Sequence, residues 1–397
     1  MTRGSRILWL LARVALVVSL SFLALALIFE VYLRQAGFLE AQPANYPCIA
    51  GDPVLNHVFH PNCQAIASAV ALKTAKDVTY KTNSLGYRGH EPARGKKTIV
   101  VIGDSYTEGF GLEENETFPS NLERALQDLG AADWQVLNGG TLGFTPALYA
   151  KYFDRFFLEI KPELVLLNLD LTDFSDEAYY LQTAEYDSRG FPVAFPGREI
   201  FPSWILGYVY SNRSALLRFL HQEANQWSLA GRREEIQPVM DQLIKKTPPL
   251  ILQDDLKATG MEGCQKSIEA VAKSVFELKR RVESVGGQLV LHMYPPGHLV
   301  KQYAALPQNI SFVRSWDQKK RRDFTWACGS GQKIVDVIRA MSNRNGILFV
   351  DSFPLIMSYP GKEALYFEKD AHWNEAGVKV VTSSVANQIF SLLKRKK

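Results

Sequence analysis

The sequence predicts an α/β fold built around a five-stranded parallel sheet. Five apolar runs, rich in β-branched residues, are separated by segments with a helical repeat. Continuous apolar runs are typical of strands that are buried on both faces, as in parallel sheets. The alternation of strands and helices predicts right-handed crossovers, which place helices on both faces of the sheet. The predicted strands are 98–103, 134–140, 163–171, 288–296 and 346–351.

The helical segments between these runs have recognisable ends. An apolar repeat over 117–129 is closed by one glycine, and a second over 265–285 is closed by two. Further helices are predicted before residue 158, over 330–343 and at the C-terminus. The complete pattern predicts a doubly wound, flavodoxin-like α/β/α sandwich. His292, inside the fourth strand, is predicted to be a core residue and not a ligand.

Residues 7–32 form one long apolar stretch with charges only near its ends. As a helix it would span roughly 39 Å at ~1.5 Å per residue, which is enough to cross a bilayer. More arginines precede the apolar centre than follow it, which favours a cytoplasmic N-terminus. We therefore predict a single-pass anchor over 1–34 in a bacterial inner (cytoplasmic) membrane, with the remaining chain on the periplasmic side. A cleaved signal peptide is the alternative.

Two segments depart from the alternation of strands and helices. Residues 35–95 are rich in proline and asparagine, so we predict an irregular lead-in that wraps the domain, with a surface loop at 81–89. Inside the predicted domain of residues 96–397, residues 175–262 hold an aromatic, proline-rich stretch followed by amphipathic helices. We predict a helical insertion there, either as a cap over the carboxyl end of the sheet or as a peripheral subdomain.

Composition and cysteine spacing argue against several classes of function. The net charge is only +4 and no basic stripe with interleaved aromatics occurs, so no nucleic-acid partner is predicted. The four cysteines form no C-x-x-C pair, which argues against a zinc site. Two disulfides, Cys48 with Cys63 and Cys264 with Cys328, would suit an extracytoplasmic domain. No metal and no organic cofactor is predicted.

The most informative stretch joins the first strand to Gly103-Asp104-Ser105. Open α/β sheets place their ligands at the carboxyl ends of the strands, so Ser105 would stand at the ligand-binding edge. A serine there can be a nucleophile if an imidazole takes its proton and a carboxylate orients the imidazole. Asp370 and His372, two residues apart before the last helix, supply both groups. The alternatives are a helix-capping role for Ser105 and a surface position for the histidine.

With these motifs the chain resembles the SGNH (GDSL-type) hydrolase superfamily. The resemblance covers roughly residues 80–173 and 286–390 and rests on short blocks in the family's order at predicted strand ends. The third block departs from the family pattern Gly-x-Asn-Asp. The blocks are Gly103-Asp104-Ser105, residues 138–145 (Asn-Gly-Gly-Thr-Leu-Gly-Phe-Thr), residues 170–173 (Asp-Leu-Thr-Asp) and Asp370-Ala371-His372.

The resemblance assigns a role to each of these blocks. It implies that Ser105 is the nucleophile, His372 its base, and Asp370 the carboxylate that orients the base. It also implies that an oxyanion would be held by the N–H groups of Ser105 and Gly143. Thr172 stands where the family has an asparagine donor, and its hydroxyl is shorter, although it can still donate a hydrogen bond.

The resemblance implies an enzyme that acts on an acylated substrate. We expect a serine hydrolase that cleaves a short acyl ester, in particular an acetyl group on a carbohydrate, because similar periplasmic members handle acetyl groups. One alternative is a transferase that moves the acyl group to a glycan. Another is a non-catalytic, membrane-tethered module that binds a glycan or a partner membrane protein, which the altered third block motivates.

Overall fold

The computed structural model describes residues 3–35, 48–72, 74, 76–186, 192–195, 214–217, 219–220, 250–261, 264–301 and 331–395. The chain divides into two compact units. One unit contains the N-terminal helix together with residues 198–230, and the other contains the sheet and everything packed on it.

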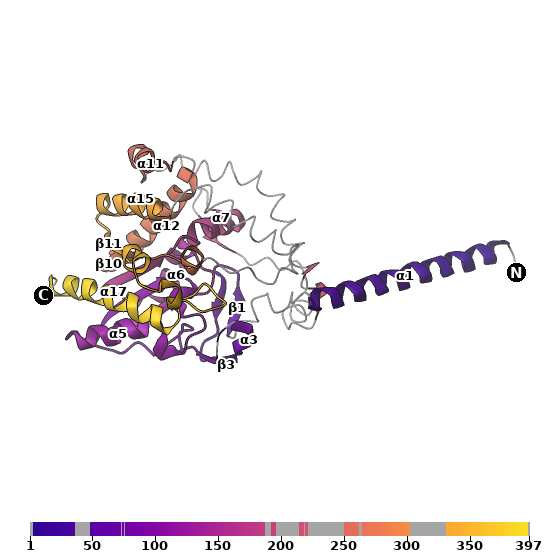
Figure 1. Ribbon diagram of the computed structural model, residues 1–397, viewed down its shortest axis with the longest axis horizontal. Helices are drawn as coiled ribbons and strands as arrows, with labels where there is room; N and C mark the ends of the chain where they lie inside the picture. The colour runs from indigo at the N-terminus through magenta and orange to yellow at the C-terminus, as the bar shows by residue number, and fades with distance from the viewer. Residues whose placement is uncertain are drawn as a thin grey trace. The chain divides into compact units, whose positions relative to one another are not determined.

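The second unit is organised around a five-stranded parallel sheet (Figure 1). The strand order is β11-β10-β7-β5-β6, so β5 lies between β6 and β7. The next strand in the chain, β6, lies on one side of β5, while β7 and the later strands lie on the other side, so the strand order reverses at β5. Such a switch point is where open α/β sheets bind ligands. The strands are β5 (Lys97–Gly103), β6 (Trp134–Gly140), β7 (Leu164–Leu169), β10 (Gln288–Met293) and β11 (Leu348–Asp351).

Helices cover both faces of this sheet and bury two hydrophobic cores. Alternate residues of β5 point to opposite faces, so Ile99 and Val101 belong to one core while Val100 and Ile102 belong to the other. Two helices, α5 and α17, pack together over the first face, and α6, α12 and α15 cover the second (Figure 1). These helices are α5 (Phe118–Asp128), α6 (Pro146–Phe156), α12 (Gln265–Ser284), α15 (Gly331–Arg344) and α17 (Glu375–Arg395).

The predicted fold class is therefore confirmed. All five predicted strands and the five predicted helices occur, and their ends differ by a few residues from the predicted ones. His292 is also a core residue, as predicted: its Nδ1 lies 2.8 Å from Asn168 Oδ1 and its Nε2 lies 2.8 Å from Ser352 Oγ. Burial lowers the pKa of His292 to about 3, so the ring is neutral.

The N-terminal unit contains helix α1 (Arg3–Gln35). Its segment Trp9–Gln35 includes an 18-residue stretch with a mean hydropathy of 2.6, none of which is buried, so by length and composition it could cross a membrane. Near its end, Glu30 accepts hydrogen bonds from the N–H of Ala215 at 3.0 Å and from Ser214 Oγ at 3.0 Å. Part of the predicted insertion therefore contacts this helix.

The predicted irregular lead-in contains regular structure. Between residues 48 and 81 the chain forms two antiparallel hairpins, and both belong to the unit that contains the sheet. Each strand has only four residues and mixed exposure, which is too short for a clear alternation of apolar and polar side chains. The strands are β1 (Ile49–Asp52), β2 (Asn56–Phe59), β3 (Gln64–Ala67) and β4 (Val78–Lys81).

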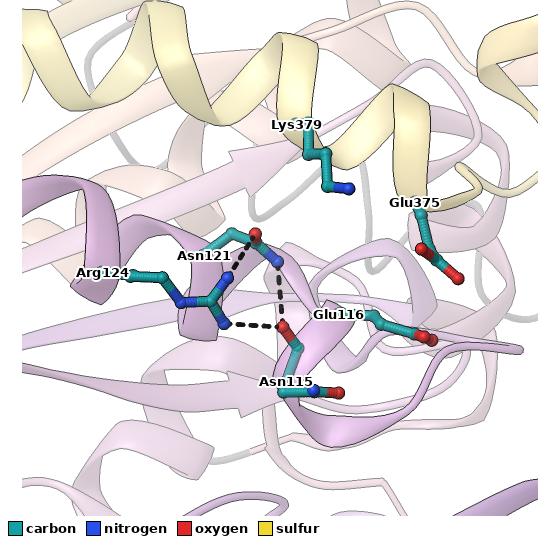
Figure 2. A pocket seen from close by; sticks show the side chains of 6 residues that line it. All are labelled: Asn115, Glu116, Asn121, Arg124, Glu375 and Lys379. Atoms are coloured by element: carbon teal, nitrogen blue, oxygen red, sulfur yellow. Dashed lines mark hydrogen bonds between the residues drawn. The ribbon is translucent and has the colours of Figure 1, made fainter.

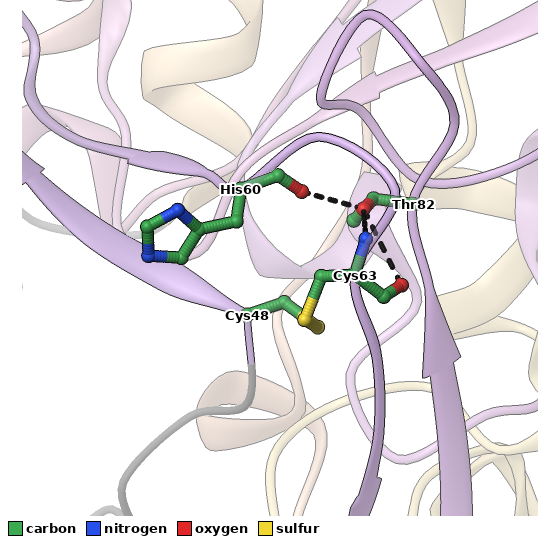
Figure 3. Close-up of a disulfide and its surroundings, with 4 residues drawn as sticks. All are labelled: Cys48, His60, Cys63 and Thr82. Atoms are coloured by element: carbon green, nitrogen blue, oxygen red, sulfur yellow. Dashed lines mark hydrogen bonds between the residues drawn. A yellow bond between two sulfur atoms is a disulfide. The ribbon is translucent and has the colours of Figure 1, made fainter.

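A disulfide joins the two hairpins. Cys48 and Cys63 are bonded, as predicted, and their Cα atoms are 5.7 Å apart (Figure 3). Beside this bond, the Thr82 hydroxyl accepts from the Cys63 N–H at 2.9 Å and donates to the His60 carbonyl at 2.6 Å. The predicted pairing of Cys264 with Cys328 falls on a residue outside the described ranges.

The prediction of a surface loop at 81–89 is wrong. Tyr87 and Arg88 are fully buried, and Asn83 is almost so. Asn83 organises the turn, because its side-chain oxygen accepts from the N–H of Leu85 at 3.0 Å and its amide group donates to the His90 carbonyl. Polar composition suggested exposure, but these polar groups are buried because they bind backbone groups of the fold.

The predicted insertion is described only in part. Phe195 lies in the core, where its N–H donates to the Val54 carbonyl at 2.8 Å and its ring meets the edge of Tyr180. The segments that would decide between a cap and a peripheral subdomain lie outside the described residues. The described elements are α7 (Asp173–Thr183), β8 (Glu185–Tyr186), β9 (Pro192–Ala194) and α11 (Gln253–Thr259).

Candidate active site

Ser105 lies at the carboxyl end of β5, at the switch point of the sheet. It begins the short helix α4 (Ser105–Glu108), which Asp104 caps by accepting from the Tyr106 N–H at 2.9 Å. Gly103 is needed at this turn because a Cβ there would lie 2.2 Å from Thr107 Oγ1. The strand-to-helix turn thus holds Ser105 in a fixed place at the edge of the sheet.

The structure brings together the three residues that the sequence singled out. Ser105 Oγ lies 2.7 Å from His372 Nε2, although the two residues are 267 positions apart. On the other side of the ring, His372 Nδ1 is hydrogen-bonded to Asp370 Oδ1, which also accepts from the His372 N–H at 2.9 Å. The His372 and Asp370 side chains are 18% and 19% exposed, so the site can be reached from solvent.

Two aromatic rings contact the imidazole of His372. Phe110 stacks on it with a centroid distance of 4.4 Å, and Tyr106 lies at 4.7 Å. The Tyr106 hydroxyl donates to the Ala371 carbonyl at 2.5 Å and accepts from the Gly297 N–H at 2.9 Å. Tyr106 therefore connects the loop of the nucleophile with the loop of the histidine.

Carboxyl groups dominate the electrostatics around His372. Burial alone would lower the pKa of His372, but the charge and hydrogen bond of Asp370 raise it above 6.5, and Asp104 and Asp170 act in the same direction. Burial, together with the charge of Asp170, raises the pKa of Asp104 to about 8.

Gly143, for which the resemblance implies an oxyanion role, lies in the turn after β6. It has φ +68°, and an added Cβ would meet no heavy atom of the described residues within 4 Å. Its loop is tied to the nucleophile's strand, since the Thr141 N–H donates to the Gly103 carbonyl at 3.0 Å. The N–H of Ser105, at the first position of α4, is the second implied donor.

Thr172, the third implied donor, points elsewhere in this structure. Its hydroxyl and its backbone N–H both donate to Asp170 Oδ1, each at 2.6 Å. Because a hydroxyl has a single proton, Thr172 would have to turn away from Asp170 to bind an oxyanion. Its role in an oxyanion hole remains a prediction.

Arg88 is a residue of this region that the sequence did not single out. It is fully buried, lies 4.2 Å from the centre of the Tyr80 ring, and donates to the carbonyls of Glu108 and Gly109 at 3.1 and 2.7 Å. It also donates to the Leu112 carbonyl. Arg88 thus supports the loop that follows the nucleophile. No signal in a single sequence distinguishes it from a surface arginine.

We expect Arg88→Met to lower the free energy of unfolding by about 3 kcal/mol or more, because it leaves several buried carbonyls without their donor. Thermal unfolding followed by circular dichroism measures the change. The control is Arg94→Met at an exposed position, for which we expect less than about 0.5 kcal/mol. Equal stability of the two variants would contradict the supporting role of Arg88.

The structure also has a pocket that Ser105, Asp370 and His372 do not line. Its volume is about 190 Å³, and its lining mixes amide, acidic and basic groups (Figure 2). Lys76 bridges two of its acids, Glu116 at 2.5 Å and Glu375 at 3.2 Å. The pocket is lined by Asn115, Glu116, Asn121, Arg124, Glu375 and Lys379.

Within the described residues no group of three or more His, Cys, Asp or Glu side chains is arranged to hold a metal ion.

Comparison with known proteins gives similarities among solved structures only. No family model matches the sequence, and no curated protein matches it. A lipase/acylhydrolase from Enterococcus faecalis is 13% identical, with a TM-score of 0.37 and coverage of 74% of this chain and 96% of that one. An esterase from Pseudoalteromonas sp. is 12% identical, with a TM-score of 0.37 and coverage of 75% and 100%.

A third solved structure, an acetyl xylan esterase, is 10% identical, with a TM-score of 0.37 and coverage of 74% of this chain and 99% of that one. The chain is thus similar to solved lipase, acylhydrolase and esterase structures over about three quarters of its length.

Proposed function

We propose that this chain is a membrane-anchored serine hydrolase of the SGNH type that cleaves short acyl esters through Ser105, His372 and Asp370. The observation that carries the proposal is the pair of hydrogen bonds that connects Ser105 Oγ, through the His372 imidazole, to Asp370 Oδ1. Nucleophilic catalysis by serine requires this order of groups and this spacing. These three side chains lie at the switch point of the sheet, where a substrate can approach.

The geometry supports a two-step reaction. Ser105 Oγ attacks the acyl carbon while His372 Nε2 takes the hydroxyl proton, and Asp370 stabilises the imidazolium that forms. The N–H groups of Ser105 and Gly143 hold the negative oxygen of the tetrahedral intermediate. His372 then gives its proton to the departing alcohol, which leaves an acyl-serine. Water attacks that ester, again with His372 as base, and releases the acid and the free serine.

The proposed substrate is an acetyl ester on a carbohydrate outside the cytoplasm. The motif resemblance supports the acetyl group, and the apolar segment Trp9–Gln35 supports the anchor. The Cys48–Cys63 disulfide supports a non-reducing compartment such as the periplasm. Transfer of the acyl group to a glycan, in place of water, is a second outcome of the same acyl-serine.

We expect the full-length protein in detergent micelles to hydrolyse p-nitrophenyl acetate at least about tenfold faster, in kcat/KM, than the octanoate ester, because a site for a short acyl group excludes a long chain. A fluorophosphonate probe should label Ser105 in the same preparation. A sugar acceptor that captures the acetyl group would favour the transferase. A folded protein with neither turnover nor labelling would contradict the hydrolase and favour the binding module.

A further inference from the structure

The loop that carries Gly143 is a tight turn. The Phe144 N–H donates to the Thr141 carbonyl at 3.1 Å, so Leu142 and Gly143 occupy its two central positions. Gly143 has φ +68° and Leu142 does not have a positive φ, which is the pattern of a type II turn. Type I and type II turns differ mainly by a rotation of the central peptide, so the orientation of the Leu142–Gly143 peptide must be fixed by other contacts.

One such contact comes from the β1–β2 hairpin of the lead-in. His57 Nε2 lies 2.8 Å from the Leu142 carbonyl oxygen, and the His57 ring meets the edge of Phe144 with a centroid distance of 5.0 Å. Because a carbonyl oxygen only accepts, Nε2 must carry the proton. Nδ1 lies 3.0 Å from Asn56 Oδ1, and because Nδ1 of the neutral ring accepts, the Asn56 amide has to be turned so that its NH2 group faces the ring.

The Leu142 carbonyl and the Gly143 N–H belong to the same peptide unit. In a trans peptide these two groups point in opposite directions, so a bond that fixes the carbonyl also fixes the N–H. Hydrogen bonding to the carbonyl polarises the unit as well, which strengthens the N–H as a donor. We propose that His57 is a positioning residue that holds the Gly143 N–H toward the oxyanion, an inference that rests on the proposed hydrolase function.

The hairpin is anchored well enough to serve this role. Asp52 accepts from the N–H of Leu55 at 2.8 Å and forms an ion pair with Arg155 of helix α6 at 2.5 Å. The Cys48–Cys63 disulfide attaches the hairpin to its neighbour. Burial lowers the pKa of His57, so the ring stays a neutral Nε2–H donor around pH 7.

The test compares two variants in the full-length protein in detergent. His57→Gln keeps an N–H donor at a similar reach, while His57→Phe keeps an aromatic ring on Phe144 but removes the donor. Loss of an oxyanion donor costs about 10²–10³ in kcat, and a misaligned donor costs less. We expect His57→Phe to lower kcat for p-nitrophenyl acetate about 10- to 100-fold with KM within about twofold, and His57→Gln to stay within about fivefold of wild type.

A purely structural role for His57 predicts the opposite order, since phenylalanine fills the site better than glutamine. Equal activity of the two variants, or a fall in kcat that follows thermal unfolding, would overturn the inference while wild-type turnover keeps the hydrolase intact. Absence of Ser105-dependent turnover in the wild type would overturn both. If His57→Phe does not fold, His57→Leu and His57→Met provide the same comparison with glutamine.

Discussion

Replacing Ser105 with alanine is expected to lower kcat for p-nitrophenyl acetate by about 10⁴- to 10⁶-fold, because the acyl-serine can no longer form. The loss should not come from unfolding. Ser105 Oγ is hydrogen-bonded to His372 alone among the interactions of the described residues, and the turn around it is held by Gly103 and the Asp104 cap. Steady-state kinetics of the purified full-length protein measure the effect.

A matched control separates this effect from a general response to losing a hydroxyl group. Ser358 is exposed and its hydroxyl donates to the Pro354 carbonyl at the end of a short helix, so Ser358→Ala should leave kcat within about twofold. Fluorophosphonate labelling should disappear in Ser105→Ala and persist in Ser358→Ala. Hydrolysis that survives in Ser105→Ala would show that another group carries the reaction.

Replacing Asp370 with asparagine is expected to lower kcat about 10⁴-fold. An asparagine at this position can present its NH2 group to His372 Nδ1, which stabilises the tautomer that has no free lone pair on Nε2. In that tautomer His372 cannot accept the Ser105 proton. Steady-state kinetics of this variant, with thermal unfolding as a test of folding, measure the effect. Glu368→Gln, which removes an exposed carboxylate from the same loop, is the control and should leave kcat within about twofold.

The pH dependence gives this prediction a second readout. The pKa of His372 is raised above 6.5, so in the wild type kcat/KM should fall as the pH drops through a value above 6.5, where the ring becomes protonated and stops acting as a base. Removal of the Asp370 charge lowers the pKa of His372, so the acidic limb should move to lower pH in Asp370→Asn. An acidic limb that is unchanged in this variant would contradict the assignment of His372 as the titrating base.

Local patterns in the sequence determined the fold class and the places where chemistry could occur. A strand buried on both faces has to be continuously apolar, so the apolar run before Gly103 could be recognised as a strand from the sequence alone. Ser105 at the end of this strand, and Asp370 and His372 two residues apart, could also be singled out from the sequence alone. The hairpins of the lead-in escaped prediction because four-residue strands leave too short a pattern.

Only the tertiary structure decided which of these groups meet. Ser105 and His372 are 267 residues apart, and their contact depends on how α17 and its preceding loop pack beside β5. The positions of Arg88 and His57 in the fold could not be predicted from the sequence for a related reason. Each acts by donating to backbone carbonyls, at Glu108 and at Leu142, and every residue type has that carbonyl. A side chain that binds the backbone of a distant loop leaves no complementary residue in the sequence, so its role follows from the packed fold alone.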